Sequence, residues 1–256
     1  MVKKLIINAD DFGMTEGVTK GIIDCHADGV LTSTTLIVNA PYTEFALAEA
    51  KKYPALGVGI HLNITYGRPL VAGAKSFTDE DGNFWQYPDY QRQKISADPK
   101  ELYAEWQAQI ERFIALAGKL PTHIDSHHHV HCQPQHQTVV MQLAKEYDLP
   151  VRRSAEFPVT EYENAHFCGD FFGDEISVAT ITTMLQQDEP ILEIMCHPAY
   201  LDQMTYHISS YNLPRMTEMA ILRSPVLRTF IEQNGIELIT FTDLEKIKGI
   251  SINSVE

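Results

Sequence analysis

The stretch KKLIINADDFGMTEGVTKGIIDCHADG, residues 3–29, shows the pattern on which the predicted fold rests. Its apolar run over 5–8 predicts a strand, because β-branched residues suit the pleated surface of a sheet. Two aspartates follow, and apolar residues at helical spacing over 15–26 predict a helix that Gly29 terminates. The segment is thus a strand–helix unit with acidic residues at the carboxyl end of its strand.

The same alternation continues along the rest of the chain. Further strands are predicted at residues 34–38, 58–64, 122–126, 150–153, 191–196 and 236–241. Further helices are predicted at residues 43–52, 99–116, 133–147, 176–185 and 226–233. Roughly seven strand–helix units in series predict a parallel sheet covered by helices.

Such a series could close into a barrel or form an open, doubly wound sheet. Neither GxGxxG nor GxxxxGK[ST] follows the first strand, which disfavours the nucleotide-binding open sheet. We therefore expect an α/β fold, a distorted (β/α) barrel of roughly seven strands. No linker-like break divides the chain, so residues 1–256 are predicted to form a single catalytic domain, with a loop insertion near residues 66–97.

Composition narrows the class of partner. A formal net charge of −14 disfavours nucleic acid, because phosphate binding requires a basic surface. No apolar run approaches membrane-spanning length, and the apolar run at the N-terminus is too short for a signal peptide, so we expect a cytoplasmic protein. Cys25, Cys132, Cys168 and Cys196 form no CxxC pair and are expected to be free thiols.

Unusual polar residues follow the predicted strands. They are Asp10 and Asp11, His61, the run 125–131 (DSHHHVH), Arg152 and His197. Because a barrel brings the carboxyl ends of its strands together, these side chains should converge. A lone histidine there is usually structural, and an aspartate can serve as a helix N-cap. Carboxylate and imidazole groups on separate strands, however, indicate a divalent ion with one face open to water.

Side-chain alternation gives expectations for the two polar runs. Asp10 and Asp11 should point in different directions if the strand stays regular, which suits one acting as a ligand and the other as a base. In the second run, Asp125, His127 and His129 share one face, and the first two should point into the barrel. His127 is favoured as a ligand. His131 is not excluded, because it stands four residues later and a helical turn could present both to one ion.

The chain resembles the YdjC-like carbohydrate deacetylases, a group that includes chitooligosaccharide deacetylases. The matching motifs are NADDFG (8–13), TSTTLIVN (32–39), GIHLN (59–63), THIDSHHHVH (122–131), FFGDEIS (171–177) and EIMCHP (193–198). They come in the family's order and span most of the chain. The resemblance implies a distorted barrel related to the polysaccharide deacetylases, and a hydrolase that removes acetyl groups from N-acetylated sugars or short oligosaccharides.

The resemblance also implies roles for individual residues. One divalent ion, magnesium or zinc, would be held by Asp11, His61 and His127. Asp10 would match the catalytic base, His197 the general acid, and Arg152 an arginine that orients the base. A homodimer is a further implication. Whether His129 or His131 also contacts the ion stays open at this level.

Sugar sites use aromatic rings as flat surfaces, and Phe12, Tyr66, Trp85 and Tyr200 lie near predicted loops. Ordinary packing is the alternative for each. The alternative functions are a metal-dependent phosphoesterase on a (β/α) barrel, which commonly binds two or three ions, and a non-enzymatic metal-binding protein. The second alternative would need neither Asp10 nor His197.

Overall fold

One curled parallel sheet forms the centre of the protein. The computed structural model describes residues 2–153, 162–163 and 165–246, and within them seven strands pair into one sheet. The strands are β1 (Lys4–Phe12), β2 (Ser33–Leu36), β3 (Gly57–Leu62), β4 (Ile124–Ser126), β5 (His166–Cys168), β6 (Ile191–Cys196) and β7 (Glu237–Leu238). Their order is β4-β3-β2-β1-β6-β5, and β7 pairs with β1.

Every strand pairing is parallel. Among the described residues, no pairing between β4 and β5 closes the sheet. The expected α/β class with a distorted (β/α) barrel is therefore confirmed, in the form of a half-barrel. Since all strands run the same way, the carboxyl ends of β1, β3, β4 and β6 meet at one edge.

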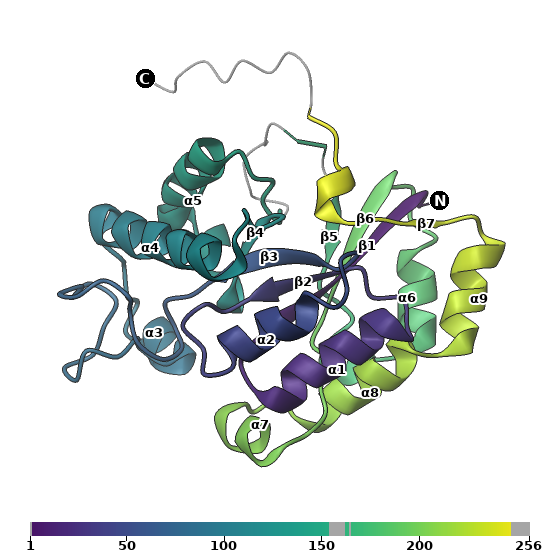
Figure 1. Cartoon of the computed structure of the whole chain (residues 1–256), viewed down its shortest axis with the longest axis horizontal. Coiled ribbons are helices and arrows are strands. Elements are labelled where there is room, and N and C mark those ends of the chain that lie inside the picture. Colours follow the sequence, from purple (N-terminus) through teal and green to yellow (C-terminus); the bar gives the residue numbers. More distant parts are fainter. Residues whose placement is uncertain (1, 154–161, 164, 247–256) are drawn as a thin grey trace.

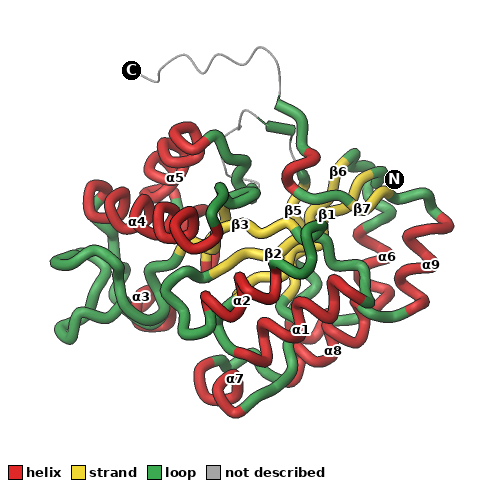
Figure 2. Tube along the Cα trace, viewed as in Figure 1, coloured by secondary structure: helices red, strands yellow, loops and turns green. Residues whose placement is uncertain are grey.

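Helices cover the sheet, as Figures 1 and 2 show. They are α1 (Glu16–Ala27), α2 (Thr43–Ala50), α3 (Tyr87–Arg92), α4 (Pro99–Ala117), α5 (Pro134–Tyr147), α6 (Val178–Met184), α7 (Gln203–Ile208), α8 (Leu213–Leu222) and α9 (Pro225–Gln233). Helix α4 packs against α5, α1 packs against α2 and α8, and α6 packs against α9. No helix in the described ranges combines the length and hydropathy needed to cross a membrane.

Local sequence explains where the main helices begin and end. The Thr15 side chain accepts a hydrogen bond from the Val18 N–H and so caps α1. Asp98 caps α4 in the same way, with Pro99 in its first turn. Helix α4 ends at Gly118, whose φ of 72° is the left-handed conformation that favours glycine.

Two predicted strands are reduced to one or two paired residues. Residues 150–153 contribute only a single bridge, between Val151 and Ile124. The strand predicted at 236–241 is β7, and it ends early because Thr240 caps a 3₁₀ turn over Phe241–Asp243. The sequence did not predict β5, α3, α7 or α8. Helix α3 lies in the segment predicted as a loop insertion, which also contributes Phe77, Phe84 and Tyr90 to the core.

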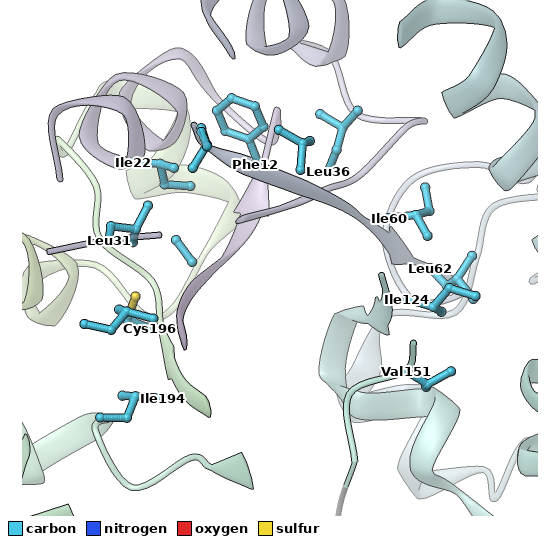
Figure 3. Close-up of a cluster of buried hydrophobic side chains, with 14 of the residues drawn as sticks. Phe12, Ile22, Leu31, Leu36, Ile60, Leu62, Ile124, Val151, Ile194 and Cys196 are labelled. Atoms are coloured by element: carbon cyan, nitrogen blue, oxygen red, sulfur yellow. The ribbon is translucent and has the colours of Figure 1, made fainter. Parts of the chain in front are cut away.

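Both faces of the central strands are buried, which is why they read as continuous apolar runs. Figure 3 shows the core around them: Phe12, Ile22 and Leu36 cluster where α1 covers β1 and β2. Ile60, Leu62, Ile124 and Val151 lie toward the β3–β4 edge. All four cysteines lie in the described part of the chain, and no disulfide links any two of them.

A substitution at Gly59 tests the packing between β3 and the 3₁₀ turn at Phe241. A Cβ on Gly59 would lie 2.5 Å from Nδ1 of the buried His123, whose ring stacks on Phe241 at 3.6 Å. We expect Gly59→Ala to lower the free energy of unfolding by about 1–3 kcal/mol in denaturant titration. In the His123→Ala background, Gly59→Ala should lower the free energy of unfolding much less, because the His123 ring that the new Cβ would meet is absent. An equal loss of unfolding free energy in both backgrounds would contradict this packing.

Candidate active site

The end of β1 is irregular at its two aspartates. Ala9 pairs with Thr34 but Phe12 pairs with Leu36, so β1 has one residue more than β2 between these points. Asp11 lies in this bulge with a φ of 71°. Such a left-handed conformation costs on the order of 1–3 kcal/mol outside glycine. The bulge breaks the regular alternation on which the expectation of different directions depended, and both aspartates line one cavity.

Arg152 is the buried cation that holds Asp10. Its Nη1 and Nη2 each donate to one Asp10 oxygen at 2.7 Å, and its Nε donates to Glu193 at 2.7 Å. Nη1 also lies 2.9 Å from Asp125 Oδ2. Burial by itself raises the pKa of Asp10, but the charge and hydrogen bonds of Arg152 outweigh burial and lower it overall. Asp10 therefore stays ionised at neutral pH.

His61 is fixed in one tautomer by Asp125. Its Nδ1 lies 2.6 Å from Asp125 Oδ1, so this nitrogen carries the proton and Nε2 presents a lone pair. Burial tends to lower the pKa of His61, but the Asp125 carboxylate outweighs it and raises the pKa. The Asp125 carboxylate therefore favours a cation at Nε2, either a second proton or a metal ion that binds the lone pair in its place. A carboxylate behind a histidine is the arrangement that commonly supports metal ligands.

Asp11, His61 and His127 bring three ligand atoms within 4.8 Å of one another. His127 Nδ1 lies 3.0 Å and His61 Nε2 lies 3.7 Å from Asp11 Oδ1. That buried oxygen nevertheless forms no hydrogen bond with any described residue. The other oxygen, Oδ2, accepts from Arg215 at 2.7 Å. One carboxylate oxygen and two imidazole nitrogens that converge in this way fit a divalent ion.

The histidine run leaves the strand at His127. Residues 127–132 form a 3₁₀ segment, and His128 and His129 have φ of 55° and 53°, so side-chain alternation does not extend past Ser126. His128 stacks on Tyr87 at 4.1 Å, outside the group of ligand atoms. Both ring nitrogens of His131 contact other groups: Nδ1 lies 2.5 Å from Ser126 Oγ, and Nε2 lies 3.1 Å from the Arg152 carbonyl oxygen. His131 is therefore not part of the group of ligand atoms.

His197 follows β6 and lines the same cavity. Burial lowers the pKa of His197 to about 4, so its ring is neutral at pH 7. Its Nδ1 has no hydrogen-bond partner among the residues that the structure describes. Helix α8 fixes its backbone, since the buried Glu218 accepts from the His197 N–H. Arg215, one turn earlier on α8, connects Asp11 to the carbonyl oxygens of His197 and Tyr211, at 3.4 and 2.8 Å.

The cavity above these residues has a volume of about 720 Å³. Aromatic side chains line the cavity, but only one of the four aromatic residues proposed from the sequence is among them. Tyr66 lines the cavity, whereas Phe12 belongs to the core, and neither Trp85 nor Tyr200 is part of the lining. The aromatic residues that do line it include Tyr87, Phe172 and Tyr211.

All six residues named from the sequence come together at this edge of the sheet. The sequence reasoning missed Arg215, Glu218 and Glu193. The first two lie on α8, which was not predicted. Glu193 had a readable signal, because it is a charged residue inside the apolar strand ILEIMC. Burial raises the pKa of Glu193 to about 7 despite its contact with Arg152.

The chain is similar in sequence to known proteins over most of its length. The family model described as "YdjC-like protein" matches residues 4–233. A "Carbohydrate deacetylase" of Brevibacillus brevis is 43% identical over 94% of this chain and 99% of its own. A "Chitooligosaccharide deacetylase" of Yersinia pestis is 40% identical over 95% of this chain and 100% of its own.

Solved structures share the fold. A proposed cellobiose-phosphate cleavage protein of Enterococcus faecalis V583 superposes with a TM-score of 0.86 at 37% identity, covering 94% of this chain and 98% of its own. A family 4 carbohydrate esterase of Streptomyces lividans, in complex with acetate, superposes with a TM-score of 0.53 at 10% identity, covering 96% and 97%. The second likeness extends to the fold alone.

Single substitutions test the ligand set. We expect Asp11→Ala, His61→Ala and His127→Ala each to lose a bound divalent ion, because each removes one of three ligand atoms. The matched control is His128→Ala, which removes the neighbouring imidazole and should retain the ion. Asp10→Ala should retain it as well. Metal content after dialysis and calorimetric titration give the readout; equal metal loss in Asp10→Ala and Asp11→Ala would overturn this division.

Arg152→Met tests the buried cation. It leaves the carboxylates of Asp10, Asp125 and Glu193 buried with no guanidinium between them, which should cost about 3–5 kcal/mol of unfolding free energy. Arg153→Met is the matched control, since Arg153 is only partly buried and lies outside this cluster; it should cost under about 1 kcal/mol. Similar unfolding midpoints for the two variants would contradict the role of Arg152.

Proposed function

Because the chain belongs to the YdjC-like protein family, we propose that it is a metal-dependent carbohydrate deacetylase acting on N-acetylated sugars or short oligosaccharides. The observation that carries this proposal is the group formed by Asp11, His61 and His127, with Asp10 and His197 lining the same cavity. Three ligand atoms leave room for water and substrate on the open side. The two remaining groups supply the proton transfers that amide hydrolysis requires.

An amide is a poor electrophile, and an amine is a poor leaving group. Hydrolysis therefore needs an activated water, stabilisation of the developing oxyanion and a proton for the nitrogen. A divalent ion held by Asp11, His61 and His127 would lower the pKa of a water and polarise the acetyl carbonyl group. Magnesium or zinc is the proposed ion; carboxylate with imidazole suits zinc and other transition ions.

Asp10 is the proposed proton acceptor. Arg152 holds both of its oxygens at 2.7 Å and Asn8 Nδ2 donates to Oδ1 at 3.0 Å, so the carboxylate is ionised and oriented before substrate arrives. The same contacts make Asp10 a weak base. It can accept a proton only from a water whose own pKa has been lowered, which ties its role to the neighbouring ligand group. Arg152 thus acts on the reaction by positioning Asp10.

His197 is the proposed proton donor to the departing amine. Its ring is neutral before turnover, as its lowered pKa of about 4 requires. It must therefore first take up, through solvent in the cavity, the proton that Asp10 removes from the water. It then releases that same proton to the nitrogen when the carbon–nitrogen bond breaks, which leaves Asp10 ionised and His197 neutral again. The backbone contact with Glu218 and the carbonyl contact with Arg215 hold the ring at the cavity wall for this step.

The alternative functions fit this site less well. A two-ion phosphoesterase needs a second group of ligands, and the second candidate group, Asp10, His61 and Asp125, shares His61 with the first. Arg152 already contacts both carboxylates of this second group, those of Asp10 and Asp125. A non-enzymatic metal-binding protein would need neither an Asp10 carboxylate held in one orientation nor a buried His197 beside the ligands. The homodimer and the cytoplasmic location stay predictions.

The proposal is tested by acetate release. The protein loaded with magnesium or zinc should release acetate from N-acetylglucosamine or its short oligomers, and Asp10→Asn should lose about 10²-fold or more in kcat while keeping its metal. A phosphate monoester and a metal-free sample are the controls. Hydrolysis of the phosphate ester, with no acetate from any acetylated sugar, would overturn the proposed function.

A further inference from the structure

Phe172 is an exposed aromatic residue at the cavity. Its side chain lines the cavity and the residue is 45% exposed, and among the described phenylalanine, tyrosine and tryptophan residues only Tyr200 and Tyr206 are also exposed. On its inner side it stacks on Tyr211 with ring centroids 4.2 Å apart and an interplanar angle of 10°. A single exposed apolar residue needs no explanation by itself. This ring, however, lines the cavity and is held from behind by Tyr211, which makes it a candidate binding surface.

Hydrogen bonds fix the stack to the candidate acid. The Gly173 N–H donates to the Tyr211 hydroxyl oxygen at 3.2 Å, and that hydroxyl donates to Glu218 at 2.5 Å. Glu218 also accepts from the His197 N–H. The segment between α7 and α8 that carries Tyr211 (Figure 1) is thus tied to Phe172 on one side and to His197 on the other.

Other aromatic rings around the cavity have less free surface. Tyr87 lies between His128 at 4.1 Å and Tyr90 at 6.5 Å, with both rings nearly parallel to it. Tyr211 lies between Phe172 and the Arg215 guanidinium group, whose Cζ is 5.6 Å from the ring centroid. The outer face of Phe172 is therefore the flat apolar surface best placed to receive a ligand beside His197.

We propose that Phe172 is the platform for a second sugar ring, the one linked to the sugar that loses its acetyl group. This inference rests on the proposed function. With the acetamido group at Asp11, His61 and His127, the rest of the substrate must extend toward the cavity rim. The C–H groups on one face of a pyranose ring form an apolar surface that packs flat on an aromatic ring. The cavity volume of about 720 Å³ accommodates more than an acetamido group.

The consequence is a preference for oligosaccharides of two or more rings over a monosaccharide. Phe172 should contribute to the binding of the dimer and not to that of the monomer. Its contribution should appear in KM and leave kcat nearly unchanged, because the ring contacts substrate away from the reacting bond.

The experiment compares the N-acetylglucosamine monomer and dimer on the metal-loaded protein. Phe172→Ala should raise KM for the dimer roughly 3- to 10-fold, with little change for the monomer. Phe172→Trp keeps a flat ring and should retain the preference for the dimer. The matched control is Tyr200→Ala, since Tyr200 is 38% exposed and does not line the cavity. Calorimetric binding to Asp10→Asn protein, with and without Phe172→Ala, reports affinity without turnover.

The outcomes separate this inference from the proposed function. Acetate release by the wild-type protein with the same monomer-to-dimer ratio in Phe172→Ala would overturn the platform and leave the deacetylase intact. Equal losses for monomer and dimer would also overturn it. Binding of the dimer that depends on Phe172, without any acetate release, would uphold the platform and overturn the deacetylase. Thermal unfolding checks that Phe172→Ala is folded.

Discussion

The buried guanidinium group of Arg152 is the interaction on which the site depends. It contacts Asp10, Asp125 and Glu193, and none of these side chains is more than 3% exposed. Without a cation between them, three buried carboxylates would each cost several kcal/mol or become protonated. Asp125 in turn fixes the tautomer of His61, which directs Nε2 toward Asp11. One side chain therefore orients the proposed base and, through Asp125, one proposed ligand.

Departures from regular backbone complete the site. The bulge in β1 brings both aspartates to one cavity, and two left-handed residues turn the chain immediately after His127. Strain of this kind persists only where surrounding contacts compensate for it. Here Arg215 holds the second oxygen of Asp11, and Ser126 holds His131 beyond the turn. The carbohydrate deacetylase chemistry that we propose thus uses positions that a regular strand would have directed to opposite faces.

The sequence predicted what depends on periodicity. Strands β1, β2, β3 and β6 follow apolar runs, and the convergence of Asp11, His61 and His127 follows from parallel strands ending at one edge. The sequence could not predict where the side chains of Asp10 and Asp11 point, because the bulge in β1 depends on how the strands pair and not on local propensity. Arg215 reaches the cavity from α8 and contacts Asp11, which lies 204 residues earlier in the chain. Phe172 reaches it from a loop that is positioned by stacking on Tyr211.

The site is proposed to bind a single ion through Asp11, His61 and His127, while Arg152 keeps the adjacent carboxylates of Asp10 and Asp125 in its own ion pairs. Anomalous diffraction from crystals grown with zinc measures this directly. We expect one peak within about 2.2 Å of Asp11 Oδ1, His61 Nε2 and His127 Nδ1, with Arg152 still bound to Asp10. Two peaks, or a peak between Asp10 and Asp125 with Arg152 displaced, would contradict a single ion bound by Asp11, His61 and His127.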